Sequence, residues 1–228
     1  PCTYACTMNI DVPSYSRRAV AVARIVLALV VFVSVVYQIT DRLIHNVFRP
    51  GEYFAFFTIQ TALMDVVVLV VGAWLAFTTP RDTRLFTVVR VCIVGFAVVT
   101  CVVYNVLLRD VPGEPGYVWP VWPNEILHVW APILLVFDWL FAPGRVGIRL
   151  RASFWVLIYP LAWVAFSIVR GLITGWWPYP FLDPTGLAGW PGVVGYIIGI
   201  ALFFLLSAFV FVAIARIWER SRALPSSR

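Results

Sequence analysis

The chain has 228 residues, of which 62% are hydrophobic and only 12% are charged. A soluble globular domain carries about twice that charged fraction, so the composition excludes a soluble globule and predicts a polytopic membrane protein. The net charge of +6 comes entirely from arginine, since the chain contains no lysine. In such a protein this charge reports how the helices are oriented and does not indicate nucleic-acid binding.

Residues 1–18 are polar and are interpreted as an N-terminal tail. Cys2 and Cys6 are the only cysteines outside apolar segments, and a CxxxC pair lacks the two further ligands that a zinc site needs. We therefore expect no metal in this tail. We also expect no cleavable signal peptide, because the first apolar run is too long and no small-residue cleavage site follows it.

Six apolar runs follow, and each is long enough to cross about 30 Å of hydrocarbon. They cover approximately residues 19–39, 53–77, 85–107, 124–142, 152–172 and 193–217. Crossings of about 20 residues each leave no room for a soluble domain. The sequence thus predicts an all-α integral membrane protein with one domain, a bundle of six transmembrane helices over residues 19–217, and a C-terminal tail over residues 218–228.

The arginines in the tails and connections are distributed asymmetrically between the two sides of this bundle. One side holds Arg17, Arg18, Arg81, Arg84, Arg145, Arg149, Arg151, Arg216, Arg220, Arg222 and Arg228. The other side holds only three, Arg42, Arg49 and Arg109. By the positive-inside rule, both termini are expected in the cytoplasm of a multi-pass protein of the cell membrane.

The second run carries a polar stripe. Thr58, Thr61 and Asp65 stand at positions i, i+3 and i+7, which share one face of a helix, and this face is expected to point into the bundle. Asp65 is expected to pair with Arg90 or Arg24, and a structural ion pair is favoured over a proton relay. Thr58 has an ordinary alternative role, because hydroxyl groups in membrane helices often bond to the i−4 carbonyl or join neighbouring helices.

The fourth run places a histidine among apolar residues. His128 follows Asn124 by four residues and Glu125 by three, so both can orient its ring or couple to its charge on one helix face. Pro132 cannot donate to the carbonyl of His128, and a kink or opening is expected there. Buried titratable groups in membrane helices are costly and are therefore functional candidates, although an interfacial histidine on a tilted helix is the alternative.

Both runs are expected to start at the outer surface, so Thr58 and His128 should lie at one depth, about 6 to 8 Å below the outer edge. A hydroxyl and an imidazole at one depth can form a nucleophile and base pair. Arg170, near the outer end of the fifth run, reaches a similar level, where it can bind a carboxylate or stabilise an oxyanion.

The connection 172–192 is rich in Trp, Pro and Gly and carries no arginine, which predicts an outer loop with aromatic anchors. Its aromatic side chains are expected to fold back over the outer end of the bundle, because rings in a linker prefer an interface or a packed lid to water. This group consists of Trp176, Trp177, Tyr179, Phe181 and, beside them, Asp183. Asp183 precedes Pro184 and has the alternative role of a turn residue.

Three segments together carry a family resemblance: FFTIQTALMD in the second run, NEILHVWAPILLVFDW in the fourth, and the loop GWWPYPFLDPTG. The chain resembles the androgen-induced protein family of membrane proteins, including its bacterial members, over nearly its whole length in order and topology. Animal members have a threonine and a histidine at the positions of Thr58 and His128. There they are the nucleophile and base of an intramembrane hydrolase that cleaves fatty acid esters of hydroxy fatty acids.

The resemblance thus implies a threonine-dependent lipid-ester hydrolase that needs no metal or cofactor and has membrane lipids or fatty acid esters as its partners. Thr58 is then the nucleophile and His128 the base. Asn124, Glu125, Thr61, Asp65, Arg170, Tyr179 and Asp183 are the candidate supporting or substrate-binding residues. Two other classes remain open: a lipid- or small-molecule-binding or transport protein without catalysis, and a scaffold whose polar residues only join helices. A transporter is expected to place polar residues at mid-membrane, whereas Thr58, His128 and Arg170 gather near one face.

Overall fold

The computed structural model describes residues 13–111 and 116–223, with side chains as far as Glu219. Cys2 and Cys6 therefore lie outside the described residues. Within these ranges helices are the only regular secondary structure and no strand is present, and six helices are long and apolar enough to cross a membrane. The fold is that of a multi-pass membrane protein, as the composition predicts.

The first two spans are continuous helices, α1 (Tyr15–Ile44) and α3 (Phe57–Thr78), with the short helix α2 (Pro50–Tyr53) between them. The third span joins α4 (Arg84–Val103) to a π-helical turn, η1 (Tyr104–Leu108). The fourth comprises α5 (Val121–Glu125), a second π-helical turn η2 (Ile126–Trp130) and α6 (Ala131–Phe141). The fifth comprises the 3₁₀ helix η3 (Leu150–Leu157) and α7 (Ile158–Thr174), and the last is α8 (Gly189–Ala223), preceded by the 3₁₀ turn η4 (Pro180–Leu182).

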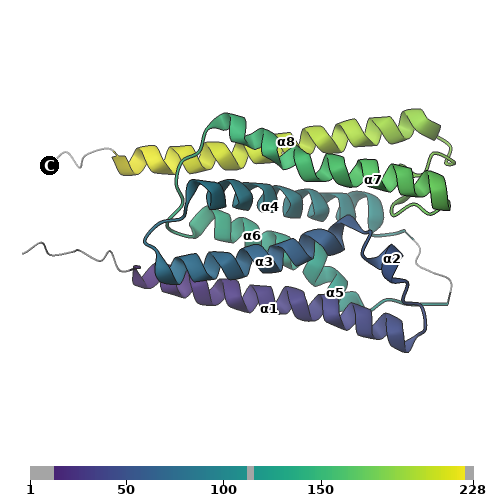
Figure 1. Cartoon of the computed structure of the whole chain (residues 1–228), viewed down its shortest axis with the longest axis horizontal. Helices are drawn as coiled ribbons and strands as arrows, with labels where there is room; N and C mark the ends of the chain where they lie inside the picture. Colours follow the sequence, from purple (N-terminus) through teal and green to yellow (C-terminus); the bar gives the residue numbers. More distant parts are fainter. Residues whose placement is uncertain (1–12, 112–115, 224–228) are drawn as a thin grey trace, which may run out of the picture.

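The helices run along the long axis of the molecule. In Figure 1, α1 and α3 lie side by side on one side, α7 and α8 lie on the other, and α4 and α6 run between them. We call the end where α1 begins and α8 ends the terminal end, and the opposite end the site end. In each span, no more than 44% of the most apolar 18-residue stretch is buried inside the protein. The remaining apolar surface faces outward, as lipid-facing surface does.

An aromatic cluster built around Phe57 packs in the interior of the bundle. Its ring lies 5.2 Å from that of Trp163 and within 6 Å of those of Phe96, Tyr159 and Phe204, measured between centroids. Four helices therefore meet at the residue immediately before Thr58. Rings in such tilted and edge-to-face arrangements stabilise a core beyond the area that they bury, so the position of Thr58 is fixed by its neighbour in the chain.

The terminal end holds a network of buried charges. Asp82 accepts from Arg17 at 3.0 Å and from Arg90 at 2.8 Å, and Asp138 accepts from Arg90 at 2.6 Å and from Arg24 at 2.8 Å. The expected pairing of Asp65 with Arg90 or Arg24 is thus wrong, because both arginines bind other carboxylates.

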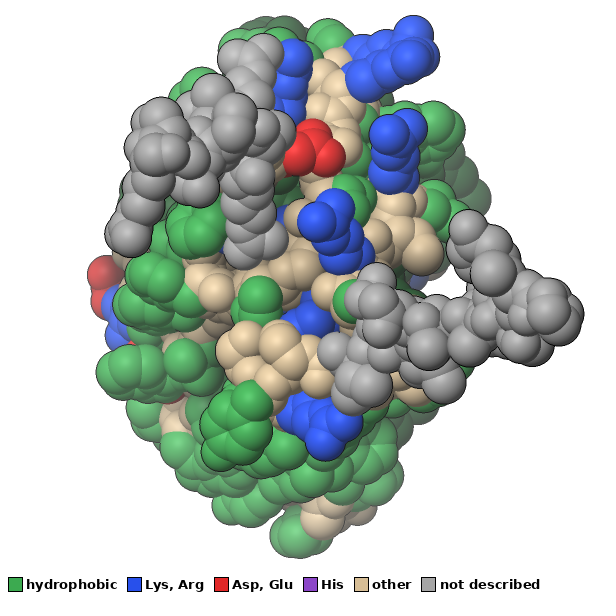
Figure 2. Space-filling model, turned by 90° about the vertical axis from the view of Figure 1, so that its left-hand side faces the viewer, with side chains coloured by type: hydrophobic (Ala, Val, Ile, Leu, Met, Phe, Trp, Pro, Cys, Tyr) green, Lys and Arg blue, Asp and Glu red, His purple; other side chains and the backbone are tan. Residues whose placement is uncertain are grey.

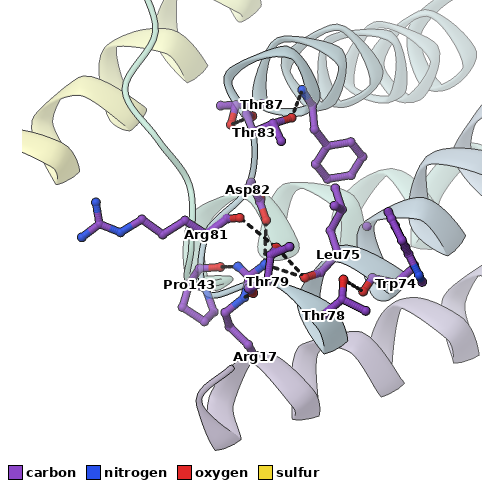
Figure 3. A network of polar contacts seen from close by, with 12 residues as sticks. Arg17, Trp74, Leu75, Thr78, Thr79, Arg81, Asp82, Thr83, Thr87 and Pro143 are labelled. Carbon is purple, nitrogen blue, oxygen red and sulfur yellow. Dashed lines mark hydrogen bonds and ion pairs between the residues drawn. The ribbon is translucent and has the colours of Figure 1, made fainter. Parts of the chain in front are cut away.

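The network also holds the ends of two helices together, as Figure 3 shows. Arg17 donates to the backbone carbonyl groups of Leu75 and Thr79 at the end of α3 and to that of Pro143 just after α6. The Leu75 carbonyl also accepts from the Thr79 N–H, and all three carbonyl groups lie at or just beyond the C-terminus of a helix, where they carry partial negative charge. They therefore offset the excess positive charge of three arginines against two aspartates.

Further arginines cover the surface of the terminal end. Figure 2 views this end of the molecule face on, with several basic side chains spread over it and few acidic ones. The exposed arginines of the connections on this side are Arg18, Arg81, Arg84, Arg149 and Arg151. The charge asymmetry that the sequence indicates is therefore an asymmetry between the two ends of the bundle.

Candidate functional site

Thr58 lies in the first turn of α3, at the site end. The sequence predicts a span from residue 53, but α2 ends at Tyr53 and the helix restarts at Phe57. Two side chains hold this break: Gln60 donates to the carbonyl of Phe54 at 2.6 Å, and the Trp163 indole N–H donates to that of Ala55 at 2.9 Å. Thr58 is consequently in the first turn of its helix, whereas a span starting at residue 53 would place it in the second turn.

His128 lies in the π-helical turn η2. The N–H of Ala131 donates to the carbonyl of Ile126, five residues back, and Pro132 follows at the start of α6. The opening expected from Pro132 thus takes the form of a wide turn, a geometry found often at functional sites. The His128 Nδ1 lies 2.9 Å from the carbonyl oxygen of Asn124. Because a carbonyl only accepts, Nδ1 carries the proton, and Nε2 of the neutral ring is an acceptor.

Tyr104 faces His128 from the other π-helical turn, η1. The two rings stack with centroids 4.0 Å apart and planes 25° apart. The side-chain amide of Asn124 donates to the Tyr104 hydroxyl oxygen at 2.6 Å. Asn124 therefore orients both rings, His128 through its backbone carbonyl and Tyr104 through its side chain. Because the Tyr104 oxygen already accepts, its own proton remains available to donate to another group.

Thr58 and His128 line one cavity of about 490 Å³ at the site end, together with Asn124, Tyr104 and Tyr179. An apolar pocket adjoins this cavity and runs between α4, α7 and α8. Four residues line both spaces: Thr58, Tyr104, Leu108 and Tyr179. The Thr58 side chain therefore stands at the boundary between a polar cavity and an apolar one.

The connection after α7 covers this cavity. Trp176 packs edge-on against Phe56 at 5.6 Å between ring centroids, and Tyr179 packs against Phe56 and Trp163 at 5.8 and 5.7 Å. Trp176, Trp177 and Tyr179 all line the cavity that holds Thr58 and His128. The prediction that this loop folds back over the bundle is confirmed, and we call residues 176–181 the aromatic lid.

Tyr179 is the lid residue that contacts Thr58. Burial raises the pKa of its hydroxyl, whereas hydrogen bonding with the Thr58 side chain and with the backbone at Phe57 and Thr58 lowers it. The first backbone N–H groups of a helix have no partner within the helix. The Tyr179 oxygen therefore lies where it can satisfy the N-terminus of α3, and it keeps its proton at neutral pH.

The other candidate residues have contacts elsewhere. Thr61 donates to the carbonyl groups of Phe57 and Thr58, Glu125 pairs with Arg109 at 2.9 Å, and Asp183 accepts from the backbone and side chain of Thr185 in a turn. Asp65 and Arg170 each have one buried side-chain atom with no hydrogen-bond partner among the described residues. The guanidinium of Arg170 lies over the Trp176 ring, 4.2 Å from its centroid.

The inward-facing stripe of the second span is confirmed, since Thr58, Thr61 and Asp65 are all buried. Of the three, only Thr58 lines the cavity. Sequence reasoning missed Tyr104, which carries no local signal beyond its place among the aromatic residues at the end of a span. It also missed Arg42, although an arginine at the less basic end of the bundle, where the connections hold only three, is a usable signal.

Comparison of the chain with protein-family models, with curated proteins and with solved structures found no match.

Proposed function

We propose that the protein is an intramembrane lipid-ester hydrolase in which Thr58 is the nucleophile and His128 the general base. The observation that carries this proposal is the cavity that Thr58 and His128 share. The imidazole of His128 has an unprotonated nitrogen, and the Thr58 hydroxyl lies where this cavity meets an apolar pocket. An ester with a long acyl chain fits this arrangement, with the chain in the apolar pocket and the ester at the boundary. The resemblance of three segments to the androgen-induced protein family supports the same assignment.

In the proposed reaction, Nε2 of His128 takes the proton of the Thr58 hydroxyl as its oxygen attacks the ester carbonyl. The resulting imidazolium is stabilised by its Nδ1–H bond to the Asn124 carbonyl. His128 then gives the proton to the departing alcohol, leaving an acyl group on Thr58. A water molecule, deprotonated by His128, attacks this acyl ester, and the released threonine oxygen takes the proton back as the fatty acid leaves.

The carbonyl oxygen becomes negatively charged in both steps and needs a donor. We assign this role to the Tyr104 hydroxyl, which lines the cavity with Thr58 and whose oxygen already accepts from Asn124. Donors that are held in place before the reaction stabilise such an oxyanion strongly. The stack of Tyr104 on His128 keeps this donor beside the base.

We further propose that both termini are cytoplasmic and that the cavity faces the outer leaflet of the cell membrane. Exposed arginines cluster at the terminal end, as the positive-inside rule requires of a cytoplasmic surface. The site end would then lie at the outer headgroups, where water for hydrolysis of the acyl-threonine is available.

A lipid- or small-molecule-binding protein without catalysis is the second candidate. One observation favours it: the Thr58 side chain interacts with Tyr179 of the lid, and the contacts of the described residues include no hydrogen bond between Thr58 and His128. In a hydrolase, this interaction must be exchanged for one with His128 when substrate binds. Hydrogen bonds of a catalytic pair often tighten only around substrate.

The test is labelling of the purified protein by a fluorophosphonate probe, together with hydrolysis of a fatty acid ester of a hydroxy fatty acid. We expect Thr58→Ala to abolish labelling. Because the two residues act as a unit, Thr58→Ala, His128→Ala and the double variant should lose hydrolysis to about the same extent.

Thr61→Ala is the matched control, since it removes a buried hydroxyl from the same helix face but outside the cavity. It should retain labelling and hydrolysis. Full labelling and hydrolysis by Thr58→Ala would refute threonine catalysis and leave the binding protein as the better assignment.

A further inference from the structure

Arg42, near the end of α1, is held by aromatic rings in the cavity that contains Thr58 and His128. Its guanidinium carbon lies 5.4 Å from the centroid of the Tyr53 ring, 5.6 Å from that of Tyr117 and 5.6 Å from that of Trp119. A cation over aromatic faces is attracted by the ring quadrupoles. Such contacts fix the position of the guanidinium while leaving its N–H donors, which lie in the plane of the group, free to bind an anion.

The acidic groups near Arg42 are engaged elsewhere. The Asp41 carboxylate accepts from the Tyr117 hydroxyl and lies 3.7 Å from Nδ1 of His45. Glu52 forms an ion pair with Arg49 at 3.5 Å. None of the ion pairs or hydrogen bonds formed by the described side chains includes the guanidinium of Arg42. The other two arginines that line this cavity each pair with a glutamate: Arg49 pairs with Glu52, and Arg109 pairs with Glu125 at 2.9 Å.

We propose that Arg42 is the anchor for an anionic group of a single-chain lipid, either a carboxylate or a phosphate. Both groups match the fork of N–H donors on a guanidinium. The lipid is argued from the two spaces: the anion would bind at the Arg42 side of the polar cavity, and the acyl chain would cross the boundary at Thr58 into the apolar pocket. This inference rests on the proposed function. It defines the preferred substrate of the proposed hydrolase as an ester that also carries a negative charge.

The anchor also explains the composition of the cavity. A partly buried arginine without an acidic partner is costly unless something supplies negative charge or a polarisable face. Three aromatic rings supply the face, and a substrate anion would supply the charge. A neutral ester gains nothing from this cation, so Arg42 would select for charged lipids over neutral ones.

The experiment measures equilibrium binding and needs no turnover, so it remains informative even if the hydrolase assignment fails. Radiolabelled oleate is bound to the full chain, immobilised in a zwitterionic detergent, and displaced by unlabelled oleate, by oleoyl lysophosphatidate or by methyl oleate. Loss of one hydrogen-bonded charge pair costs about 10- to 100-fold in affinity. We expect Arg42→Gln to weaken oleate binding by this factor and to leave displacement by methyl oleate unchanged.

Arg42→Lys keeps the positive charge but loses the fork of N–H donors. Its affinity for oleate should lie between those of the wild type and Arg42→Gln. Arg81→Gln is the matched control, because it removes the same charge at an exposed side chain that does not line the cavity. It should change oleate affinity less than about twofold.

Stronger displacement by lysophosphatidate than by oleate, lost in Arg42→Gln, would identify a phosphate as the anion, and the reverse order would identify a carboxylate. Equal affinity of wild type and Arg42→Gln for oleate, or methyl oleate displacing as well as oleate, would refute the anchor. Because oleate contains no ester bond and its binding needs no turnover, the outcome of this test is separate from that of the hydrolysis test.

Discussion

At the scale of single residues, buried charge distinguishes the two ends of the molecule. The Asp82 side chain has no exposed surface and accepts from two arginines, whereas Glu52 makes one exposed pair. Removing one member of a buried pair leaves uncompensated charge, which costs about 3 to 5 kcal/mol. An exposed pair contributes less than about 1 kcal/mol.

We therefore expect Asp82→Asn to lower the free energy of unfolding by about 3 to 5 kcal/mol, measured by titrating the protein with SDS in mixed micelles. Glu52→Gln is the control for loss of an acidic side chain and should stay within about 1 kcal/mol of wild type. A small effect of Asp82→Asn would mean that the carbonyl groups of Leu75, Thr79 and Pro143 suffice to hold Arg17.

The sequence predicts which side chains are buried where the period of the helix sets the direction in which they point. The spacing of Thr58, Thr61 and Asp65 fixes a shared face, and all three are buried. Partner choice was not predictable, because Asp82 and Asp138 reach their arginines only after α1, α4, α6 and the connection between α3 and α4 have packed together. The same holds for Tyr104, whose place beside His128 depends on the two π-helical turns meeting.

At the scale of elements, the aromatic lid rests on one glycine of α7. A Cβ atom at Gly171 would lie 2.4 Å from Cζ3 of Trp177, a distance that requires the indole to move. Gly199 in α8 has no atom within 4 Å of such a Cβ. Alanine is favoured over glycine in a helix by about 1 kcal/mol, so substitution alone should stabilise both helices.

We therefore expect opposite signs from the two substitutions. Gly171→Ala should lower the thermal midpoint and increase iodide quenching of tryptophan fluorescence, because overpacking costs about 1 to 3 kcal/mol and displaces the lid. Gly199→Ala should leave quenching unchanged and hold or raise the midpoint. If Gly171→Ala behaved like Gly199→Ala, the lid would be held by its contacts with Phe56 and Trp163 and not by its close approach to Gly171.

Element boundaries show where sequence reasoning stops. The six apolar runs are predictable because length and hydropathy alone define them, and all six spans are present. The break at residues 54–56 was missed because the apolar run FAFF continues through it. It is enforced by tertiary contacts, the Gln60 amide on Phe54 and the Trp163 indole on Ala55, which no local pattern encodes.

At the scale of the whole molecule, orientation decides which membrane leaflet the cavity meets. The sequence places eleven arginines in the tails and connections of one side against three on the other. In the structure this asymmetry separates the two ends of the bundle, since Arg42, Arg49 and Arg109 lie at the site end with the cavity. Because short basic segments are retained in the cytoplasm during insertion, the terminal end should be cytoplasmic.

A pair of reporter fusions tests this orientation in cells. Alkaline phosphatase, which is active only outside the cytoplasm, should be inactive when fused after Arg228 and active when fused to a chain truncated after Asn46, beyond a single span. A fluorescent reporter that folds only in the cytoplasm should give the reverse pattern. An active phosphatase at the C-terminus would show that the orientation is the opposite of the one predicted. The cavity with Thr58, His128 and Arg42 would then open to the cytoplasmic leaflet and take its lipid from that leaflet.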